Sequence, residues 1–418
     1  MTAPEKEKCQ RDLEKQGVKY SVESLFAEVA RDRVEMVQAF LACGMSVETT
    51  GPDNWTLLHE AAKNGSDRTV RLLLDAHANV NARTTLYEVT PLSRAAGKGH
   101  TSTVGVLLAA GAEVEGYALI LAAQGGNVDT IRALLAAHTD VNHRDGEKKT
   151  PLLWYFNGQQ KPGVLDALIA AGADVNAVDD RGMSALFWAI QQGGDASVAA
   201  LIAAHADVNR AALSNGHKET PLMHAVASGY LNIIKMLLAA GADVNAMPED
   251  GQTALTRTVD WGKPDLVDVL LQAGADLKAP QGGRFLIGAA KNGWPALVRK
   301  ALDAGADANT GAQGEGPPLV ALLAAWTSTI DWLASAEVQD RMQADPVYAK
   351  ERKDEFVQAA KARSEIACLL LRAGAKANLK NADGASANSL LKKLGFADAA
   401  EFRGKGCALS AKMPKRAR

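Results

Sequence analysis

The sequence has few aromatic residues and no long hydrophobic run. Phe, Trp and Tyr make up 5% of the 418 residues, although hydrophobic residues together make up 47%, with abundant Ala and Leu. Such a composition favours closely packed helices, because Ala and Leu are strong helix formers. No run of about 18 apolar residues occurs, so the sequence predicts no membrane-spanning helix.

The chain also lacks a strong charge of either sign. Its formal net charge is -2, which gives no electrostatic reason to expect nucleic acid as a partner. The first eight residues are polar and charged and contain no apolar core of a secretory signal. We therefore expect a cytoplasmic protein, with a periplasmic location as the alternative if a signal peptide was removed.

Cysteine is scarce, and no two cysteines lie close together in the sequence. The four are Cys9, Cys43, Cys368 and Cys407, two near each end. Their spacing does not match a zinc site. We expect four unpaired thiols in a reducing compartment, and the alternative is two disulfides that clamp the ends.

The sequence contains no recognisable catalytic motif. A Gly-rich phosphate loop, a His-Glu-x-x-His motif and a Gly-x-Ser-x-Gly motif are all absent. The sequence therefore predicts no enzyme, no metal site and no cofactor.

A phrase close to Gly-Ala-Asp-Val-Asn recurs along almost the whole chain. It is intact at residues 172–176 and 241–245. Degenerate copies begin at Gly44, His77, Gly111, His138, His205, Gly274, Gly305 and Gly374. Most steps between copies are close to 33 residues, a period typical of stacked helix–turn–helix units.

One unit shows why these residues predict two helices. Thr220 suits a helix N-cap, and Pro221 suits the first helical position, where a missing N–H has no cost. Gly229 and Gly241 are expected to end the two helices in the left-handed conformation. The second helix has one apolar stripe, formed by Ile233, Ile234, Leu237 and Leu238. Such a short unit buries its apolar faces only by stacking on neighbours.

The chain resembles the ankyrin repeat family from about residue 21 to 384. The resemblance lies in the Thr-Pro-Leu-His-like openings (such as 56–59, 90–93 and 220–223), the Ala-Ala pairs (61–62, 95–96, 122–123 and 289–290) and the Gly-Ala-Asp-Val-Asn endings. It implies an all-α solenoid of about ten stacked helix-turn-helix units with short hairpin loops. It also implies a concave face, formed by hairpins and first helices, that usually binds another protein. The regular, Ala-rich units suggest a bacterial origin.

Several segments depart from the period. The step from Gly111 to His138 is 27 residues, so we expect one hairpin to be missing before Tyr117. The step from Gly305 to Gly374 is 69, which places an insertion at about 327–361, expected to be an extra helical hairpin broken at Asp345-Pro346. Flanking the solenoid we expect an N-terminal segment (1–20), one capping helix within 385–403 and a mobile basic tail (404–418).

The histidines and asparagines of the repeats are expected to be structural. His77, His138 and His205 occupy the glycine slot of widely separated units, so a helix-capping role is favoured over a metal site. The resemblance implies that His59 bridges the backbones of neighbouring loops. The recurring Asn residues after the second helices are explained by turn hydrogen bonds: Asn81, Asn142, Asn176, Asn209 and Asn245.

Candidate partner-binding residues are expected at fixed slots of the units. With the opening Thr as slot one, slots eight and nine should face the concave groove. They hold Lys63-Asn64, Gly97-Lys98, Gln124-Gly125, Asn157-Gly158, Gln191-Gln192, Ala227-Ser228, Asp260-Trp261 and Lys291-Asn292. Slot five adds a ladder that passes from aromatic to cationic: Trp154, Trp188, His224 and Arg257.

Aromatic residues are the candidate anchors of this surface, because they dominate interface hot spots. Trp55 and Trp261 are expected on the concave rim, and Trp154 and Trp188 should be neighbours in successive units. For Trp154 two interpretations stay open, a core ring or an exposed anchor. The predicted binding residues are Trp55, Lys63, Asn64, Trp154, Trp188, Gln191, Gln192, His224, Arg257 and Trp261.

These features predict a monomeric, non-enzymatic scaffold that holds an unidentified protein in its groove and binds neither nucleic acid nor membrane. The alternative is an inhibitor or immunity-type protein that blocks another protein's active site, with the insertion as the blocking element. A catalytic segment could lie only in that insertion, which contains no His and no Cys.

Overall fold

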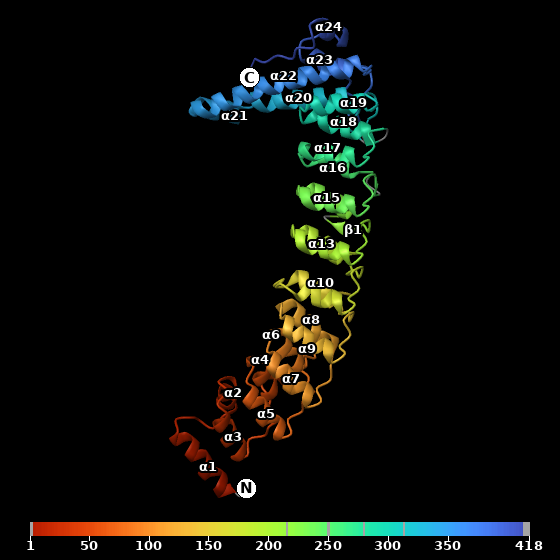
Figure 1. Cartoon of the computed structure of the whole chain (residues 1–418). Coiled ribbons are helices and arrows are strands. Elements are labelled where there is room, and N and C mark those ends of the chain that lie inside the picture. Colours follow the sequence, from red (N-terminus) through yellow and green to blue (C-terminus); the bar gives the residue numbers. More distant parts are fainter. Residues whose placement is uncertain (1–2, 215, 249–250, 279–280, 312–313, 413–418) are drawn as a thin grey trace. The chain divides into compact units, whose positions relative to one another are not determined.

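The computed structural model describes the chain except for residues 1–2, 215, 249–250, 279–280, 312–313 and 413–418 (Figure 1). The chain divides into two compact units, Met1–Asp207 and Val208–Arg418, and each is described by itself. In both units, pairs of short helices follow one another along the sequence. The described residues form only one short sheet, so the predicted all-α repeat architecture is confirmed.

The first unit begins with a terminal helix and continues as helix pairs. Its helices are α1 (Ala3–Lys15), α2 (Val22–Ala30), α3 (Val34–Ala42), the 3₁₀ turn η1 (Pro52–Asn54), α4 (Leu57–Asn64), α5 (Asp67–Asp75), α6 (Pro91–Lys98), α7 (Thr101–Ala109), α8 (Gly116–Gly125), α9 (Val128–Ala136), α10 (Pro151–Asn157), α11 (Val164–Ala170), α12 (Ala185–Gln191) and α13 (Asp195–Ala203).

The second unit begins with a hairpin of β1 (Ala212–Ser214) and β2 (His217–Glu219), which pair antiparallel with Leu213 opposite Lys218. Its helices are α14 (Pro221–Ser228), α15 (Leu231–Ala239), α16 (Ala254–Asp260), the 3₁₀ turn η2 (Pro264–Leu266), α17 (Val267–Gln272), α18 (Gln281–Lys291), α19 (Pro295–Asp303), α20 (Pro318–Ala334), α21 (Ala336–Ala344), α22 (Pro346–Arg372), α23 (Ala387–Lys393) and α24 (Ala399–Gly404).

The helix boundaries lie where the capping residues predict them. The Thr220 side chain accepts a hydrogen bond from the Met223 amide, and Gly229 ends α14 in the left-handed conformation. The same N-cap bond forms at Thr56, Thr90, Thr150, Ser184, Thr253 and Ser386. His77, His138 and His205 each have a φ of 63°, so they occupy the glycine slot in the left-handed conformation, as predicted.

The first helices of successive repeats pack on one another, and so do the second helices. Within the first unit, α4 contacts α6 and α6 contacts α8, while α5 contacts α7 and α7 contacts α9. The interfaces are filled by apolar side chains, and the largest that are fully buried are Trp326, Phe40, Phe156, Phe187, Phe285 and Phe402. First helices therefore form one layer and second helices another.

Asparagine side chains link neighbouring units at the ends of the second helices. The Asn142 Nδ2 donates to the Gly172 carbonyl (3.2 Å), and its Oδ1 accepts from the Asp174 amide (2.7 Å). The same two bonds recur at Asn176, Asn209, Asn245 and Asn309. These residues bind the following unit, a role beyond the local turn that the sequence analysis assigned to them.

The irregular segments follow the predictions in outline. Helix α8 begins at Gly116 with no hairpin before it, as the short step predicts. The insertion lengthens α20 and α22, which contact each other, and α21 lies at their far end (Figure 1). Trp326 stacks on Phe356 between these two helices, with ring centroids 4.8 Å apart. Asp345 caps α22, so the expected break at Asp345-Pro346 is confirmed.

The expectation of four unpaired thiols is wrong in this structure. Cys9 is bonded to Cys43 and Cys368 to Cys407, with Cα atoms 5.5 and 5.6 Å apart, and no described cysteine is free. Sequence separations of 34 and 39 hide this proximity, which only the folding of the terminal segments onto the end units creates. The alternative of two clamping disulfides holds instead.

The C-terminal cap also differs from the single predicted helix. Gly395 adopts a φ of 89°, which breaks the segment into α23 and α24. The beginning of the predicted mobile tail is packed, because Cys407 and Leu409 are buried and the Leu409 amide donates to Ser364 Oγ (2.9 Å). Most of the basic run, residues 413–418, lies outside the described residues.

Among the described residues, no single helix has the length and apolar character needed to cross a membrane. Helices α20 and α21, which meet at a bend of 56°, meet the length and composition criteria only when taken together.

Candidate functional site

The ten predicted binding residues lie on first helices or at their ends, but they differ in accessibility. Trp261 is the most open aromatic among them, with 54% of its surface exposed. Lys63, Asn64, Gln191 and Gln192 are also exposed, whereas Trp55, Trp154 and Trp188 are partly buried. His224 and Arg257 are buried.

Trp154 and Trp188 are partly buried rings with their own cations. Lys149 lies 4.8 Å from the centre of the Trp154 ring, and the Trp154 Nε1 donates to Asp145 Oδ2 (2.6 Å). The Arg181 guanidinium lies 5.4 Å from the Trp188 ring. These contacts satisfy part of the binding capacity of the indoles within the protein. Trp154 is therefore neither a fully buried core ring nor a fully exposed anchor.

His224 and Arg257 are not surface anchors, which corrects the predicted ladder. The Glu219 carboxylate, at the end of β2, accepts hydrogen bonds from Arg257 (2.7 Å) and from His224 Nδ1 (3.1 Å). Burial alone would raise the pKa of Glu219, but the bond from His224 and the charge of Arg257 lower it overall. The hairpin supplies a buried carboxylate, so slot five points into the protein here.

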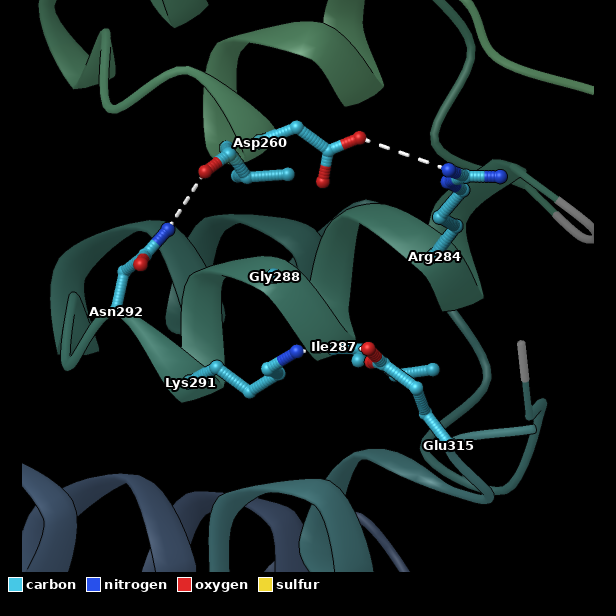
Figure 2. Close-up of a pocket in the computed structure, with 8 residues that line it drawn as sticks. Asp260, Arg284, Ile287, Gly288, Lys291, Asn292 and Glu315 are labelled. Atoms are coloured by element: carbon cyan, nitrogen blue, oxygen red, sulfur yellow. Dashed lines mark hydrogen bonds and ion pairs between the residues drawn. The ribbon is translucent and has the colours of Figure 1, made fainter. Parts of the chain in front are cut away.

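A hollow of about 370 Å³ lies in the second unit, between the end of α16, the face of α18 and the loop before α20 (Figure 2). Two ion pairs line it. Arg284 lies 3.6 Å from Asp260, and Lys291 donates to Glu315 at 2.7 Å. Each cation that lines this hollow therefore has a carboxylate beside it.

The floor of this hollow is a glycine. A Cβ added at Gly288 would approach Val259 Cγ2 to 2.5 Å, so only glycine lets α18 lie this close to α16. Burial raises the pKa of Asp260 even though Arg284 and Arg257 oppose the shift. The exposed Trp261 follows Asp260 directly in the sequence, although it is not itself among the lining residues of the hollow.

A second hollow, of about 440 Å³, lies in the first unit across the ends of α6, α8 and α10. Its lining consists of Arg94, Gly97, Lys98, Leu121, Gln124, Gly125, Asn157, Gly158 and Gln159. Six of these residues occupy the predicted slots eight and nine of three successive repeats. The predicted slots therefore line real hollows in both units.

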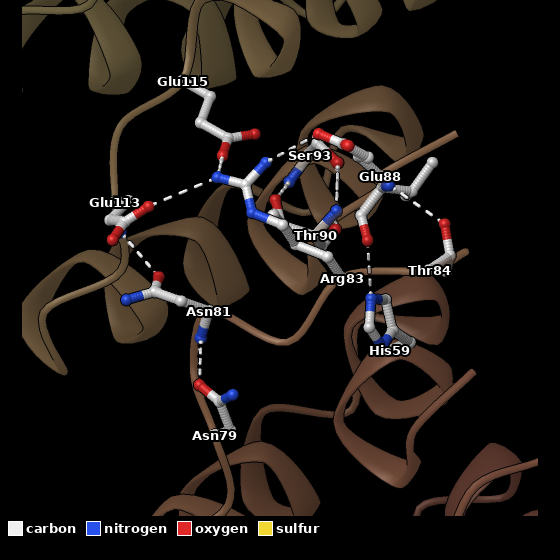
Figure 3. Close-up of polar contacts among 11 residues, drawn as sticks. His59, Asn79, Asn81, Arg83, Thr84, Glu88, Thr90, Ser93, Glu113 and Glu115 are labelled. Atoms are coloured by element: carbon white, nitrogen blue, oxygen red, sulfur yellow. Dashed lines mark hydrogen bonds and ion pairs between the residues drawn. The ribbon is translucent and has the colours of Figure 1, made fainter. Parts of the chain in front are cut away.

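The hairpin loops of the first unit carry a polar network that fixes neighbouring loops (Figure 3). His59 bonds its own N-cap Thr56 through Nδ1 and the Val89 carbonyl through Nε2 (2.8 Å), so it bridges two loops as predicted. Arg83 pairs with Glu113 (3.3 Å) and with Glu115 in the next loop. These groups bind one another, which favours a structural role.

Sequence reasoning missed Arg284, Glu315 and Gln159, which lie outside the slots it used. Arg284 begins the unit whose opening Thr is lost, and Glu315 lies in the loop before α20, so neither had a repeat position to mark it. Among the residues that the structure describes, no group of three His, Cys, Asp or Glu side chains could hold a metal ion.

Comparison with known proteins agrees with the architecture. The sequence model of ankyrin repeats (3 copies) matches residues 25–118, 119–212 and 210–281. The chain is 32% identical to human Rabankyrin-5 over 217 residues, which is 48% of this chain and 18% of that protein. It is 34% identical to the chicken nuclear factor NF-kappa-B p105 subunit over 121 residues, 29% of this chain and 12% of that protein.

A third relative is the putative palmitoyltransferase ZDHHC13 of Danio rerio, 28% identical over 228 residues, 53% of this chain and 30% of that protein. The matches thus span under a third of each of these relatives. They come from animals and give no support to the expected bacterial origin, and the matched segments do not fix the number of units. Ankyrin repeats generally mediate contacts between proteins and are typically non-enzymatic. Since the family model matches well over half of the sequence, the chain belongs to the ankyrin repeat family.

Proposed function

We propose that this protein is a non-enzymatic scaffold that holds a protein partner in the concave groove formed by hairpins and the ends of first helices. The observation that carries the proposal is the exposure of Trp261, which directly follows Asp260 in the sequence, where Asp260 lines the polar hollow with Arg284, Lys291 and Glu315. Exposed aromatic rings next to polar groups are typical of interface anchors. Membership of the family supports the same function.

The mechanism is binding by a surface that is already ordered. Most first helices begin with a side-chain N-cap bond and pack on neighbouring first helices, so few side chains lose freedom when a partner binds. Trp261 would supply apolar contact, and the hollow would orient polar groups of the partner. We also propose that the chain acts as a monomer, with neither nucleic acid nor membrane as its partner.

The test is affinity capture from native lysate with the full chain as bait, read by mass spectrometry. We expect one protein to be retained by the wild type and lost with Trp261→Ala, which should weaken binding by about 2 kcal/mol if the ring is a hot spot. Leu231→Ala is the matched control, since Leu231 is an exposed apolar residue on a second helix. Equal retention by both variants would contradict a binding surface centred on Trp261.

A second candidate is an inhibitor or immunity-type protein whose long helical hairpin blocks another protein's active site. The observation that favours it is the exposure of two large apolar residues on that hairpin, Trp332 (50%) and Val347 (68%). Trp332→Ala separates the candidates in the same capture experiment. Loss of the partner with Trp332→Ala and not with Trp261→Ala would favour the hairpin.

For the compartment, we propose an oxidising one, the alternative that the sequence analysis left open. The support is that both cysteine pairs are bonded, because disulfides persist chiefly in oxidising environments. Thiol titration of protein from its native source, unfolded without reductant, should find no free thiol. Four thiols would instead favour the cytoplasm.

A further inference from the structure

The hollow in the first unit differs from that in the second in its charge. Arg94 and Lys98 line it, and the other lining residues are Gly, Leu, Asn and Gln. No carboxylate is among its described lining residues. In the second unit, by contrast, Asp260 and Glu315 accompany the two cations.

Arg94 is held in place but is not neutralised. Its guanidinium lies 5.0 Å from the centre of the Trp55 ring, and the Trp55 Nε1 is bonded to Glu60 Oε2 (2.9 Å). Glu60 also binds Lys63 and Asn64. Within the described parts of the chain, Arg94 forms no ion pair, and its buried Nε has no hydrogen-bond partner. A buried donor without an acceptor is costly, and the positive charge of Arg94 has no carboxylate beside it within the described lining of the hollow.

Lys98 adds a second positive charge to the lining of the hollow. It lies four residues after Arg94 on α6, so both side chains lie on one face of the helix. Like charges at this spacing repel each other. The structure describes no ion pair for Lys98 either, and its side chain is exposed. An anion in the hollow would relieve the repulsion between the two cations.

The floor of the hollow is formed where neighbouring first helices pack backbone against backbone. A Cβ at Gly125 would lie 2.7 Å from the Gly97 carbonyl oxygen, and one at Gly158 would lie 2.2 Å from the Gln124 oxygen. Glycine is therefore required for α6, α8 and α10 to come this close. The amide side chains of Gln124, Asn157 and Gln159 also line the hollow and can bond a peptide.

We propose that this hollow, lined by Arg94 and Lys98, binds a carboxylate side chain, Asp or Glu, of an extended segment of the protein partner. The inference rests on the proposed function, since it names the chemistry of the segment that the groove would hold. Arg94 would bind the carboxylate through its guanidinium, and Lys98 would add a second, more exposed charge. The amides at the rim would bond the peptide backbone. An acidic partner segment is favoured over a basic one because the lining residues bear only positive charge.

The experiment uses an array of nine-residue peptides with random flanks and a central Glu, Gln, Lys or phosphoserine, probed with the full oxidised chain. We expect Glu-centred peptides to bind at least ~10-fold more strongly than Gln-centred ones, as is typical when an ion pair replaces a neutral hydrogen bond. Lys-centred peptides should bind least. The preference for Glu should shrink as salt is raised to about 0.5 M.

Variants assign the preference to this hollow. Arg94→Gln and Lys98→Gln should each reduce the Glu-over-Gln ratio to about 3 or less. Lys98 is exposed, so its substitution should leave the melting temperature unchanged even if Arg94→Gln, which loses its packing on Trp55, is less stable. Lys235→Gln, at an exposed position of the second helix α15, is the matched control and should keep the full preference.

The outcomes separate this inference from the proposed function. If peptides bind without a preference for Glu, or if the preference survives both substitutions, the proposal that this hollow binds an acidic segment is wrong. The proposal that the groove binds a protein partner would still stand. A stronger preference for phosphoserine than for Glu would overturn the proposal that the ligand of this hollow is a carboxylate side chain. Failure to bind any peptide, together with unchanged partner capture by Trp261→Ala, would count against both.

Discussion

Reduction of the Cys9–Cys43 disulfide should release the N-terminal helix α1 while the repeats stay folded. Among the α1 side chains that the structure describes, Leu13 alone is buried. Burial of one Leu stabilises by about 1.5–3 kcal/mol. A helix of 13 residues is marginal in water by itself. The disulfide is therefore expected to hold α1 in place.

The size of the effect follows from the length of chain that the bond closes. Because α2 and α3 stay folded, the flexible part of this loop is the chain between Cys9 and α2, about 12 residues, for which the loop-entropy relation gives about 3 kcal/mol. Since each 1.4 kcal/mol is a factor of ten, opening of α1 should become easier by about two orders of magnitude. The central units should not change, because each unit of a solenoid contacts only its neighbours.

Hydrogen exchange read by mass spectrometry, with and without a phosphine reductant, measures this directly. The C-terminal pair provides an internal comparison, because Cys368–Cys407 closes a similar loop of 39 residues. That cap keeps a buried Phe402 and the bond from Arg403 to the Leu371 carbonyl (2.9 Å), so it should lose less protection. Unchanged exchange in α1 after both thiols are shown to be free would refute the reasoning.

Three further predictions concern stability. Trp326→Ala should cost about 3–5 kcal/mol in chemical unfolding because the ring is fully buried, whereas Trp332→Ala, at an exposed position of the same helix, should change stability by less than about 0.5 kcal/mol. Asn176→Ala removes two bonds between units and should cost about 1–2 kcal/mol in the same assay, with an effect near zero refuting a linking role. Burial, with a contribution from a nearby arginine, lowers the pKa of His59. The stabilisation from keeping His59 neutral should therefore be complete above about pH 6.5 and be lost as the pH falls from there through the folded pKa. A pH titration of the free energy of unfolding should lack this pH-dependent contribution in His59→Gln.

The parts of this fold that were predictable are those set by local chemistry. Thr220 and Gly229 mark the two ends of a helix through cap geometry that needs no distant partner. His77 adopts the left-handed conformation usual for glycine because it too ends a helix. The insertion was visible because it breaks a period. Slots eight and nine were predictable because every repeat has the same backbone, so Lys98 in slot nine and Lys291 in slot eight both line hollows.

What escaped prediction depends on contacts that the period does not encode. The burial of His224 and Arg257 depends on Glu219, which the β1–β2 hairpin places against them. The disulfides depend on terminal segments that lie outside the repeats. The unpaired charge of Arg94 also escaped prediction, because the absence of a carboxylate beside it becomes apparent only when the lining of the hollow is known.

The two hollows show how a repeated backbone can carry different recognition chemistry. Both lie over slots eight and nine, and in both a glycine floor lets neighbouring first helices come close. The difference lies in a few side chains. Lys291 has Glu315 within 2.7 Å, whereas Lys98 has no described acidic partner. A cation already paired adds little attraction for an incoming anion, because the anion must displace the existing carboxylate. On the proposed function, selectivity would be set by which slots lack a counter-charge, while caps, asparagine links and terminal disulfides would hold the surface that presents them.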